Sequence, residues 1–297
     1  MVAWRLCRII VKNILTNYYF WFFSIFFVVF WSFMGAYAFS RNITLENTRR
    51  ALINAGTPPE VVDMVLDEVW SRVVRGYTGG WYATVIVISF GSTATGLIQV
   101  VYYSTILLRY LSKFSRISNR RILLELIVGS LITLLVSFVM LLAVTTLMFS
   151  HRFSQLVLPE NPAGLLAAGL AYGLFIYVFS MALGLLVVVL RKPGLLFRIT
   201  FIPLVLAMAF SMISVYIGGE VYHYSPFISS MNLIFYYYTA VKPPLDQPLA
   251  FAAASYTPVE PIHAWITQTS WIVAFTLISL LLLEKQRGVP AEEIIRL

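Results

Sequence analysis

Six runs of about 20 or more mostly apolar residues divide this sequence, and the centre of each run contains no Asp, Glu, Lys or Arg. A helix needs about 20 such residues to cross the hydrocarbon core of a bilayer. Only 11% of the chain is charged, whereas a soluble domain has about 25% charged residues. The sequence therefore predicts an all-α integral membrane protein with six transmembrane helices. They are expected at Tyr18–Phe39, Trp81–Leu108, Ile122–Phe149, Ala163–Leu190, Ile199–Ile217 and Ala264–Leu283.

The distribution of charge predicts the orientation of these helices. Lys and Arg concentrate on the cytoplasmic side of membrane proteins. With both termini in the cytoplasm, the inner segments hold fourteen of the 21 basic residues but only four of the 13 acidic ones. We therefore expect a multi-pass protein of the cell (plasma) membrane with both termini cytoplasmic and residues 284–297 as a cytoplasmic tail.

The first 17 residues are expected to form an amphipathic helix in the cytoplasmic interface. Arg5, Arg8 and Lys12 are spaced i, i+3, i+7 and share one helical face, while Trp4 and Ile10 lie elsewhere. Helices with this distribution lie in the plane of the membrane surface. The alternative is a cytosolic extension of the first span.

Residues 40–80 predict an external helical hairpin. A short helix over 45–55 would end at Gly56, where a glycine commonly terminates a helix. The stretch TPPE at 57–60 is a strong start for a second helix, because Thr57 can cap it and Glu60 completes a capping box. This helix is expected to end at Gly76, before the span that begins at Trp81.

The sequence Asn42-Ile43-Thr44 is an N-glycosylation sequon on the predicted outer side. Asn42 is therefore a candidate for modification, although its closeness to the first span works against glycan transfer.

The segment 218–263 is too long for an ordinary connection between helices. Within it, SPFISSMNLIFYYYTAV (225–241) is apolar but short for a span. We expect an external segment with one or two helices that dip back into the membrane, where irregular backbone must be buried or line a cavity. A seventh span is the competing interpretation.

Residues that would supply energy or catalysis are missing from the sequence. The ATP-binding pattern G-x-x-x-x-G-K-[ST] fails because Gly-Lys never occurs, and the spans lack the central charges that proton relays use. His151, His223 and His263 do not have the spacing of a metal site. We expect a non-catalytic chain that holds no cofactor itself.

Small residues predict two close helix contacts. Gly169 and Gly173 form a GxxxG pattern in the fourth span, and SFGSTATG (89–96) lies in the second. Such residues let helices approach closely. Packing within one subunit is the favoured interpretation, and a contact between two copies is the alternative.

A compact basic run, RYLSKFSRISNRR at 109–121, separates the second and third spans. It holds five cations and no acid, which is more than orientation alone requires. No nucleic-acid-binding module accompanies it, so we expect no nucleic acid partner. Apolar side chains lie between the cations, which is typical of a protein contact surface.

The sequence resembles the membrane subunits of ABC-2-type (type II exporter) ABC transporters. The shared features are the interfacial helix before six spans, the basic segment after span two and the long external segment after span five. Leu108–Ser130 carries the closest likeness, with Arg120 and Arg121 just before Ile122, and Ser225–Pro226 is similar to the family's Ser-Pro beyond span five. The sequence departs from the family in its larger external hairpin and in lacking acidic residues before the basic segment.

The resemblance implies a permease that pairs with a second copy of itself or a related permease and couples to separate ATPase subunits, which bind ATP and Mg. Residues 109–121 would be the coupling helix that docks into the ATPase. Its expected contact residues are Tyr110, Lys113, Phe114, Arg116, Ile117, Arg120 and Arg121. Spans one, two and five would line the path of an amphipathic, lipid-like or drug-like substrate. A secondary carrier or channel, and an intramembrane enzyme or assembly factor, are the alternatives.

Overall fold

The computed structural model describes residues 7–8, 11–12, 15–16, 18, 21–114, 119–212, 224–243 and 258–285, and for helical residues 23–24, 106–114, 119–123 and 212 it describes the backbone alone. Every element over three residues long in this part of the chain is helical. In chain order they are the π-helix η1 (Trp21–Phe26), α3 (Phe27–Phe33), the π-helix η2 (Met34–Phe39), α4 (Leu45–Asn54), α5 (Pro59–Phe114), α6 (Asn119–Phe153), α7 (Pro162–Leu190), the 3-10 helix η3 (Pro193–Leu195), α8 (Leu196–Thr200), α9 (Ile202–Met212), α10 (Pro226–Thr239) and α11 (Pro261–Lys285).

Five helical stretches among the described residues are long and apolar enough to cross a membrane. They are Pro59–Thr105, Leu124–Phe153, Pro162–Leu190, Pro193–Ser211 and Pro261–Lys285. The first predicted span is helical from Trp21 to Phe39, with α3 between two π segments. Its apolar stretch Phe27–Phe39 is shorter than the five spanning stretches. The fold is therefore that of an all-helical membrane protein, while a sixth span remains a prediction.

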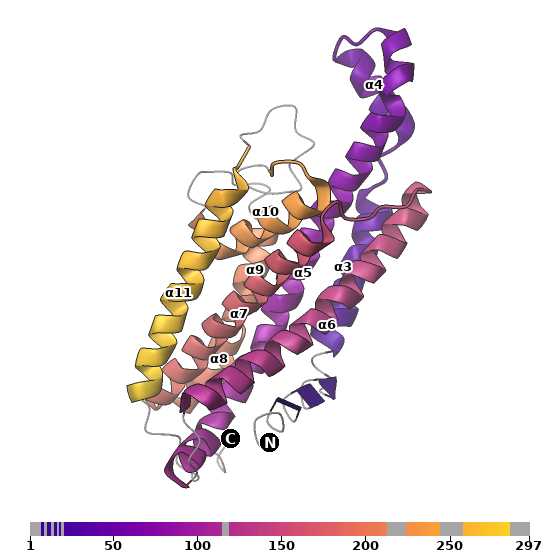
Figure 1. Cartoon of the computed structure of the whole chain (residues 1–297). Helices are drawn as coiled ribbons and strands as arrows, with labels where there is room; N and C mark the ends of the chain where they lie inside the picture. Colours follow the sequence, from indigo (N-terminus) through magenta and orange to yellow (C-terminus); the bar gives the residue numbers. More distant parts are fainter. Residues whose placement is uncertain are drawn as a thin grey trace.

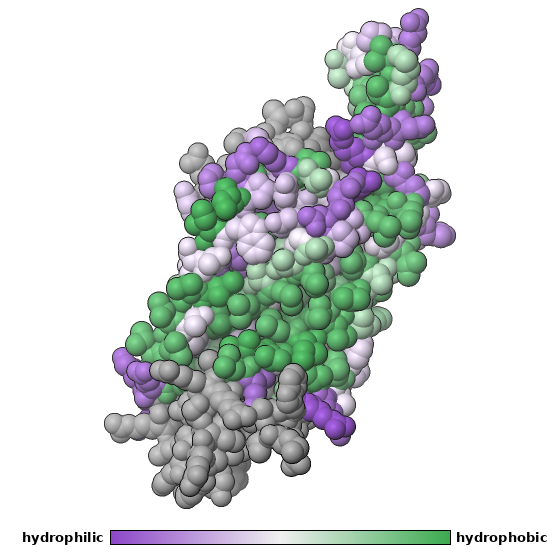
Figure 2. Space-filling model, in the orientation of Figure 1, coloured by the Kyte–Doolittle hydropathy of each residue, from purple (hydrophilic) through white to green (hydrophobic). Residues whose placement is uncertain are grey.

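The long helices run side by side and give the molecule two different ends (Figure 1). The hairpin end carries α4, the start of α5 and the connection between α6 and α7. The basic end carries the C-terminal ends of α5, α7 and α11. Between them, Figure 2 shows a continuous apolar zone on the visible face, with hydrophilic residues toward the hairpin end. This zone is where a bilayer would surround the bundle.

Helix α5 is continuous from the hairpin through the bundle, which corrects the expected helix end at Gly76. It covers 56 residues, and Gly76 lies in its interior. The nearby Gly79 explains why glycines occur here: a Cβ at this position would come within 2.7 Å of Thr239 in α10. These glycines allow two helices to pack closely. The predicted turn at Gly56 is present, with a φ of 88° after α4.

Helix α10 lies buried among α5, α7, α9 and α11. It has 14 residues, too few to cross a bilayer. Pro226 occupies its first turn, where the missing amide hydrogen costs nothing, and Ala240 ends it in the left-handed conformation with a φ of 57°. The remaining parts of segment 218–263 outside 224–243 and 258–263, like most of residues 1–17, fall outside the described residues.

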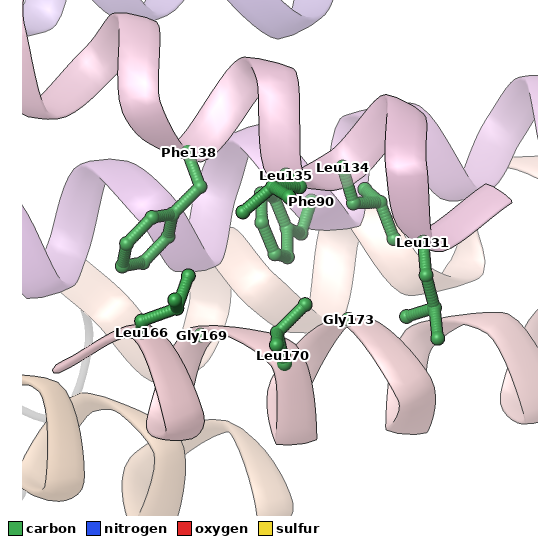
Figure 3. A pocket seen from close by; sticks show the side chains of 9 residues that line it. All are labelled: Phe90, Leu131, Leu134, Leu135, Phe138, Leu166, Gly169, Leu170 and Gly173. Carbon is green, nitrogen blue, oxygen red and sulfur yellow. The ribbon is translucent and has the colours of Figure 1, made fainter. Parts of the chain in front are cut away.

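The GxxxG pattern of α7 packs against α6 within one chain. Figure 3 shows Gly169 and Gly173 facing the side chains of Phe138 and Leu134 across a narrow apolar groove. A methyl group at Gly169 would overlap the Phe138 ring, and one at Gly173 would lie 3.2 Å from Leu134. Close packing inside one subunit therefore accounts for both glycines.

Replacing Gly169 with Ala tests this contact. Ala is normally favoured over Gly in a helix by about 1 kcal/mol, but overpacking a tight interface costs about 1–3 kcal/mol. We expect Gly169→Ala to lower the melting temperature of the detergent-purified protein. Gly194→Ala is the control, because a Cβ at Gly194 meets nothing within 4 Å. Equal melting temperatures for both variants would show that α6 and α7 are not held this closely.

Candidate functional site

The predicted docking segment lies where α5 ends and α6 begins. Tyr110, Lys113 and Phe114 belong to the last turns of α5, and Arg120 and Arg121 belong to the first turn of α6. The expected separate helix over 109–121 is therefore not seen in the described backbone, because the two long helices extend into this segment. The prediction for Arg116 and Ile117 lies outside the described residues.

This junction projects at the basic end of the bundle. Figure 1 shows the end of α5 reaching beyond the ends of α7 and α11. The same end carries Arg191, Lys192 and Arg198, all of which are exposed. Arg191 caps α7 in the left-handed conformation, where a cation also complements the negative end of the helix dipole. The described parts of two cationic segments predicted for one side of the membrane, 109–121 and 191–198, thus lie at one end.

Contacts between segments far apart in the sequence stabilise the hairpin end. Arg75 of α5 forms an ion pair with Glu160 in the α6–α7 connection. The backbone amides of Glu160 and Asn161 donate to the carbonyls of Tyr238 and Tyr237, each at 3.0 Å. These carbonyls end α10 and have no partner within their own helix. The connection therefore stabilises the end of α10.

The first helix is attached at the same end. The Tyr77 hydroxyl donates to the Gly35 carbonyl at 2.9 Å, within the π-helical η2. The Arg152 guanidinium donates to the Ser40 carbonyl at 3.2 Å and to its hydroxyl at 3.0 Å. Side chains from α5 and α6 therefore hydrogen-bond the backbone at this end of the helix.

An open cleft of about 940 Å³, lined by both charged and apolar residues, lies at the foot of the hairpin. Its lining comes from α5 and from the residues that end α10. Arg72 pairs with Glu68 at 3.0 Å, and Arg75 pairs with Glu160, so the cleft does not present charge of one sign. Asn42 is exposed at this end, and the Thr44 hydroxyl of its sequon accepts a hydrogen bond from the Asn47 amide. Glycosylation of Asn42 remains a prediction.

Polar side chains are buried around α10. The Ser230 hydroxyl lies 2.9 Å from the Gln268 Oε1 of α11, and Gln268 Nε2 lies 3.5 Å from the Ala171 carbonyl of α7. Asn232 is fully buried, and neither polar atom of its side chain has a hydrogen-bond partner. An unsatisfied buried amide is costly, so Asn232 is an exception that the packing alone does not explain.

Charged side chains do not contribute to the core that the structure describes. The buried polar residues there are Ser, Thr, Asn and Gln, and the described residues contain no group of His, Cys, Asp and Glu side chains that could hold a metal ion. A proton relay would use ionisable groups at depth. Among the described residues, no Asp, Glu, Lys, Arg or His is classed as buried.

Comparison of the chain with protein-family models, with curated proteins and with solved structures finds no match in any of the three. The functional interpretation consequently depends on the chain's own residues and their arrangement.

The sequence interpretation missed the buried polar contacts around α10. Asn232 stands within an apolar stretch and Gln268 within a predicted span. Each was visible as an isolated amide in a hydrophobic run, which is a usable signal because such groups need partners in the interior. Their pairing could not be foreseen, since it depends on how α10 enters the bundle.

The two buried amides should respond oppositely to replacement by Leu. Asn232→Leu removes unsatisfied polar atoms, which cost about 1–3 kcal/mol, and we expect a higher melting temperature in detergent. Gln268→Leu removes a partner of Ser230, and we expect a lower one. Two equal shifts of the same sign would contradict the assignment of Asn232 as unsatisfied.

Proposed function

We propose that this chain is the membrane-spanning permease subunit of an ATP-driven exporter of the ABC-2 type. In this proposal two permeases form the substrate path, and separate ATPase subunits bind ATP and Mg and drive transport. The chain itself is non-catalytic and lies in the plasma membrane with both termini cytoplasmic. Its substrate is amphipathic, lipid-like or drug-like.

The observation that carries the proposal is the projecting junction of α5 and α6. It combines a basic sequence, RYLSKFSRISNRR, with a position at the basic end of the bundle, where α5 ends and α6 begins. Both helices that meet there continue through the bundle. A partner that moved this junction would therefore move two long helices directly.

The lack of an internal energy source also favours an external one. The sequence has no Gly-Lys for a phosphate-binding loop. The described core lacks the buried charges on which proton-driven carriers rely. An ATPase partner docked at the basic end supplies the missing energy without requiring either.

Charge reversal at Arg116 and Arg120 tests the docking surface. We expect the double variant Arg116→Glu/Arg120→Glu to lose its P-loop ATPase partner during co-purification, with recovery falling at least about tenfold, because unlike charges across an interface become like charges. The measurement is the ratio of ATPase to permease after affinity purification in mild detergent.

The matched control is Arg191→Glu/Lys192→Glu, which makes the same charge change at exposed residues of the same end. It should retain the ATPase. If the docking variant also retains a coupled ATPase, residues 109–121 are not the dock. If the unaltered chain recovers no such ATPase, the exporter assignment is wrong.

A further inference from the structure

Helix α10 begins inside the bundle and ends near its surface. The Trp271 indole of α11 donates to the Tyr224 carbonyl, just before α10, at 2.8 Å. Trp271 lies ten residues, about 15 Å, from the first residue of α11 at the hairpin end. The last turn of α10 lies at the hairpin end itself, where Thr239 packs against Gly79 of α5. The helix therefore runs from membrane depth to the hairpin end (Figure 1).

The connection between α6 and α7, residues 154–161 and here named the strap, holds the end of α10. Two strap amides, one of them from Glu160, donate to carbonyls at the end of α10, each at 3.0 Å. The Tyr238 hydroxyl of α10 donates to the Val157 carbonyl of the strap at 3.2 Å. Glu160 also forms an ion pair with Arg75. The strap thus joins the end of α10 to α5.

Farther inside the bundle, two polar side chains of this segment lack hydrogen-bond partners. Asn232 is fully buried, and neither polar atom of its side chain is bonded. Ser225 directly precedes the helix and is 7% exposed, yet its hydroxyl neither caps α10 nor bonds elsewhere. By contrast, Ser230 has Gln268 Oε1 at 2.9 Å. Since unsatisfied buried polar groups are costly, the described position of α10 is stable only because other contacts hold it.

There is space for α10 to move along its axis toward the hairpin end. The cleft of about 940 Å³ is lined by Thr239, Ala240 and Val241 on one side and by residues of α5 on the other. Asn232 lies seven residues, about 10 Å, before Thr239. A shift of one helical turn, about 5.4 Å, would move Asn232 about half of this distance toward water.

We propose that α10 has two positions and that the strap controls which of them it occupies. In the described position the strap holds α10 inward, and Asn232 and Ser225 are unsatisfied. In the second position α10 is shifted toward the hairpin end, its last turn lies in the cleft, and Asn232 gains hydrogen bonds to water. Packed helices switch between discrete arrangements of this kind. Because Arg75 belongs to α5, a movement of α5 that separates Arg75 from Glu160 weakens the strap.

This conformational device goes beyond the proposed export function and does not depend on it. The position of α10 is measured in the purified chain without any partner, whereas the export proposal is tested by recovery of an ATPase. The two proposals can therefore fail separately.

Labelling of a cysteine at the end of α10 reports the position of the helix. Thr239 is 6% exposed, so Thr239→Cys should react slowly with a water-soluble methanethiosulfonate reagent until the last turn enters the cleft, because the reactive thiolate forms where water reaches. The full chain carries Cys7→Ser, which removes the only native cysteine, and is placed in phosphatidylcholine nanodiscs. Ala51→Cys, at an exposed position of α4, reports access of the reagent.

The variant Glu160→Gln/Tyr238→Phe weakens the strap, because it removes the ion pair and the tyrosine hydrogen bond while keeping the size of both side chains. We expect labelling of Thr239→Cys to become about tenfold faster, the combined effect of a partly exposed ion pair and a buried hydrogen bond. The matched control is Glu46→Gln/Tyr77→Phe, which removes an ion pair and a tyrosine-to-carbonyl bond away from α10. It should leave the labelling rate unchanged.

Removing the unsatisfied groups should reverse the effect. In the weakened-strap background, Asn232→Leu and, separately, Ser225→Ala should each slow labelling at least about threefold, because the shifted position no longer relieves an unsatisfied polar group. Ser225→Ala introduces no larger side chain and so cannot overpack the site. Equal labelling with the intact and the weakened strap would show that the strap does not hold α10. Faster labelling that neither replacement slows would show that the helix end only loosens. Either result overturns the proposal.

Discussion

Close approach between helices is the constraint on which the rest of this structure depends. In lipid, helices gain little from the hydrophobic effect when they associate, so van der Waals packing and hydrogen bonds must hold them together. Helix α5 meets α10 at Gly79 and α9 at Gly91, and Gly184 of α7 lies against the Ile98 carbonyl of α5. Helices α7, α9 and α10 thus each approach the central α5 at a glycine. This close approach allows α10 to be buried between α5 and the other helices.

The two ends of the bundle differ in how firmly they are tied. At the hairpin end, Arg75, Arg152 and the amides of the α6–α7 connection join α5, α6, α10 and the first helix. Exposed ion pairs add little stability individually, but these contacts also satisfy backbone groups at helix ends. At the basic end, Arg191 and Lys192 are exposed. The molecule therefore has one end at which distant segments are joined by hydrogen bonds and an ion pair, and one end at which cations are exposed.

Much of the helical architecture could be predicted from hydrophobic runs, because an apolar stretch of about 20 residues has few alternatives to a helix in lipid. Helix ends were less predictable. Gly76 looked like a stop signal, but a glycine inside a helix can equally serve packing, and only the three-dimensional neighbours distinguish the two. The π segments at Trp21–Phe26 and Met34–Phe39 have no sequence signature that was recognised.

The candidate functional sites were likewise only partly predictable from the sequence. The basic run at 109–121 was visible from charge and from its place between two spans, but its division between α5 and α6 was not. Gln99 was counted as part of an apolar span, because a single amide hardly changes the composition of 28 residues. Its exposure is a property of the assembled bundle. The local sequence therefore identified the segments of the candidate sites better than it identified which of their residues are exposed.

The length of α5 has a mechanical consequence. A continuous helix of 56 residues is about 84 Å long at 1.5 Å per residue, so it acts as a rod that reaches from one aqueous surface to beyond the other. If it pivots about its middle by about 5°, each tip swings by about 4 Å on this geometry. A small rotation at one end of α5 would therefore displace its other end in the opposite direction. A motion that begins at the basic end would in this way move the hairpin.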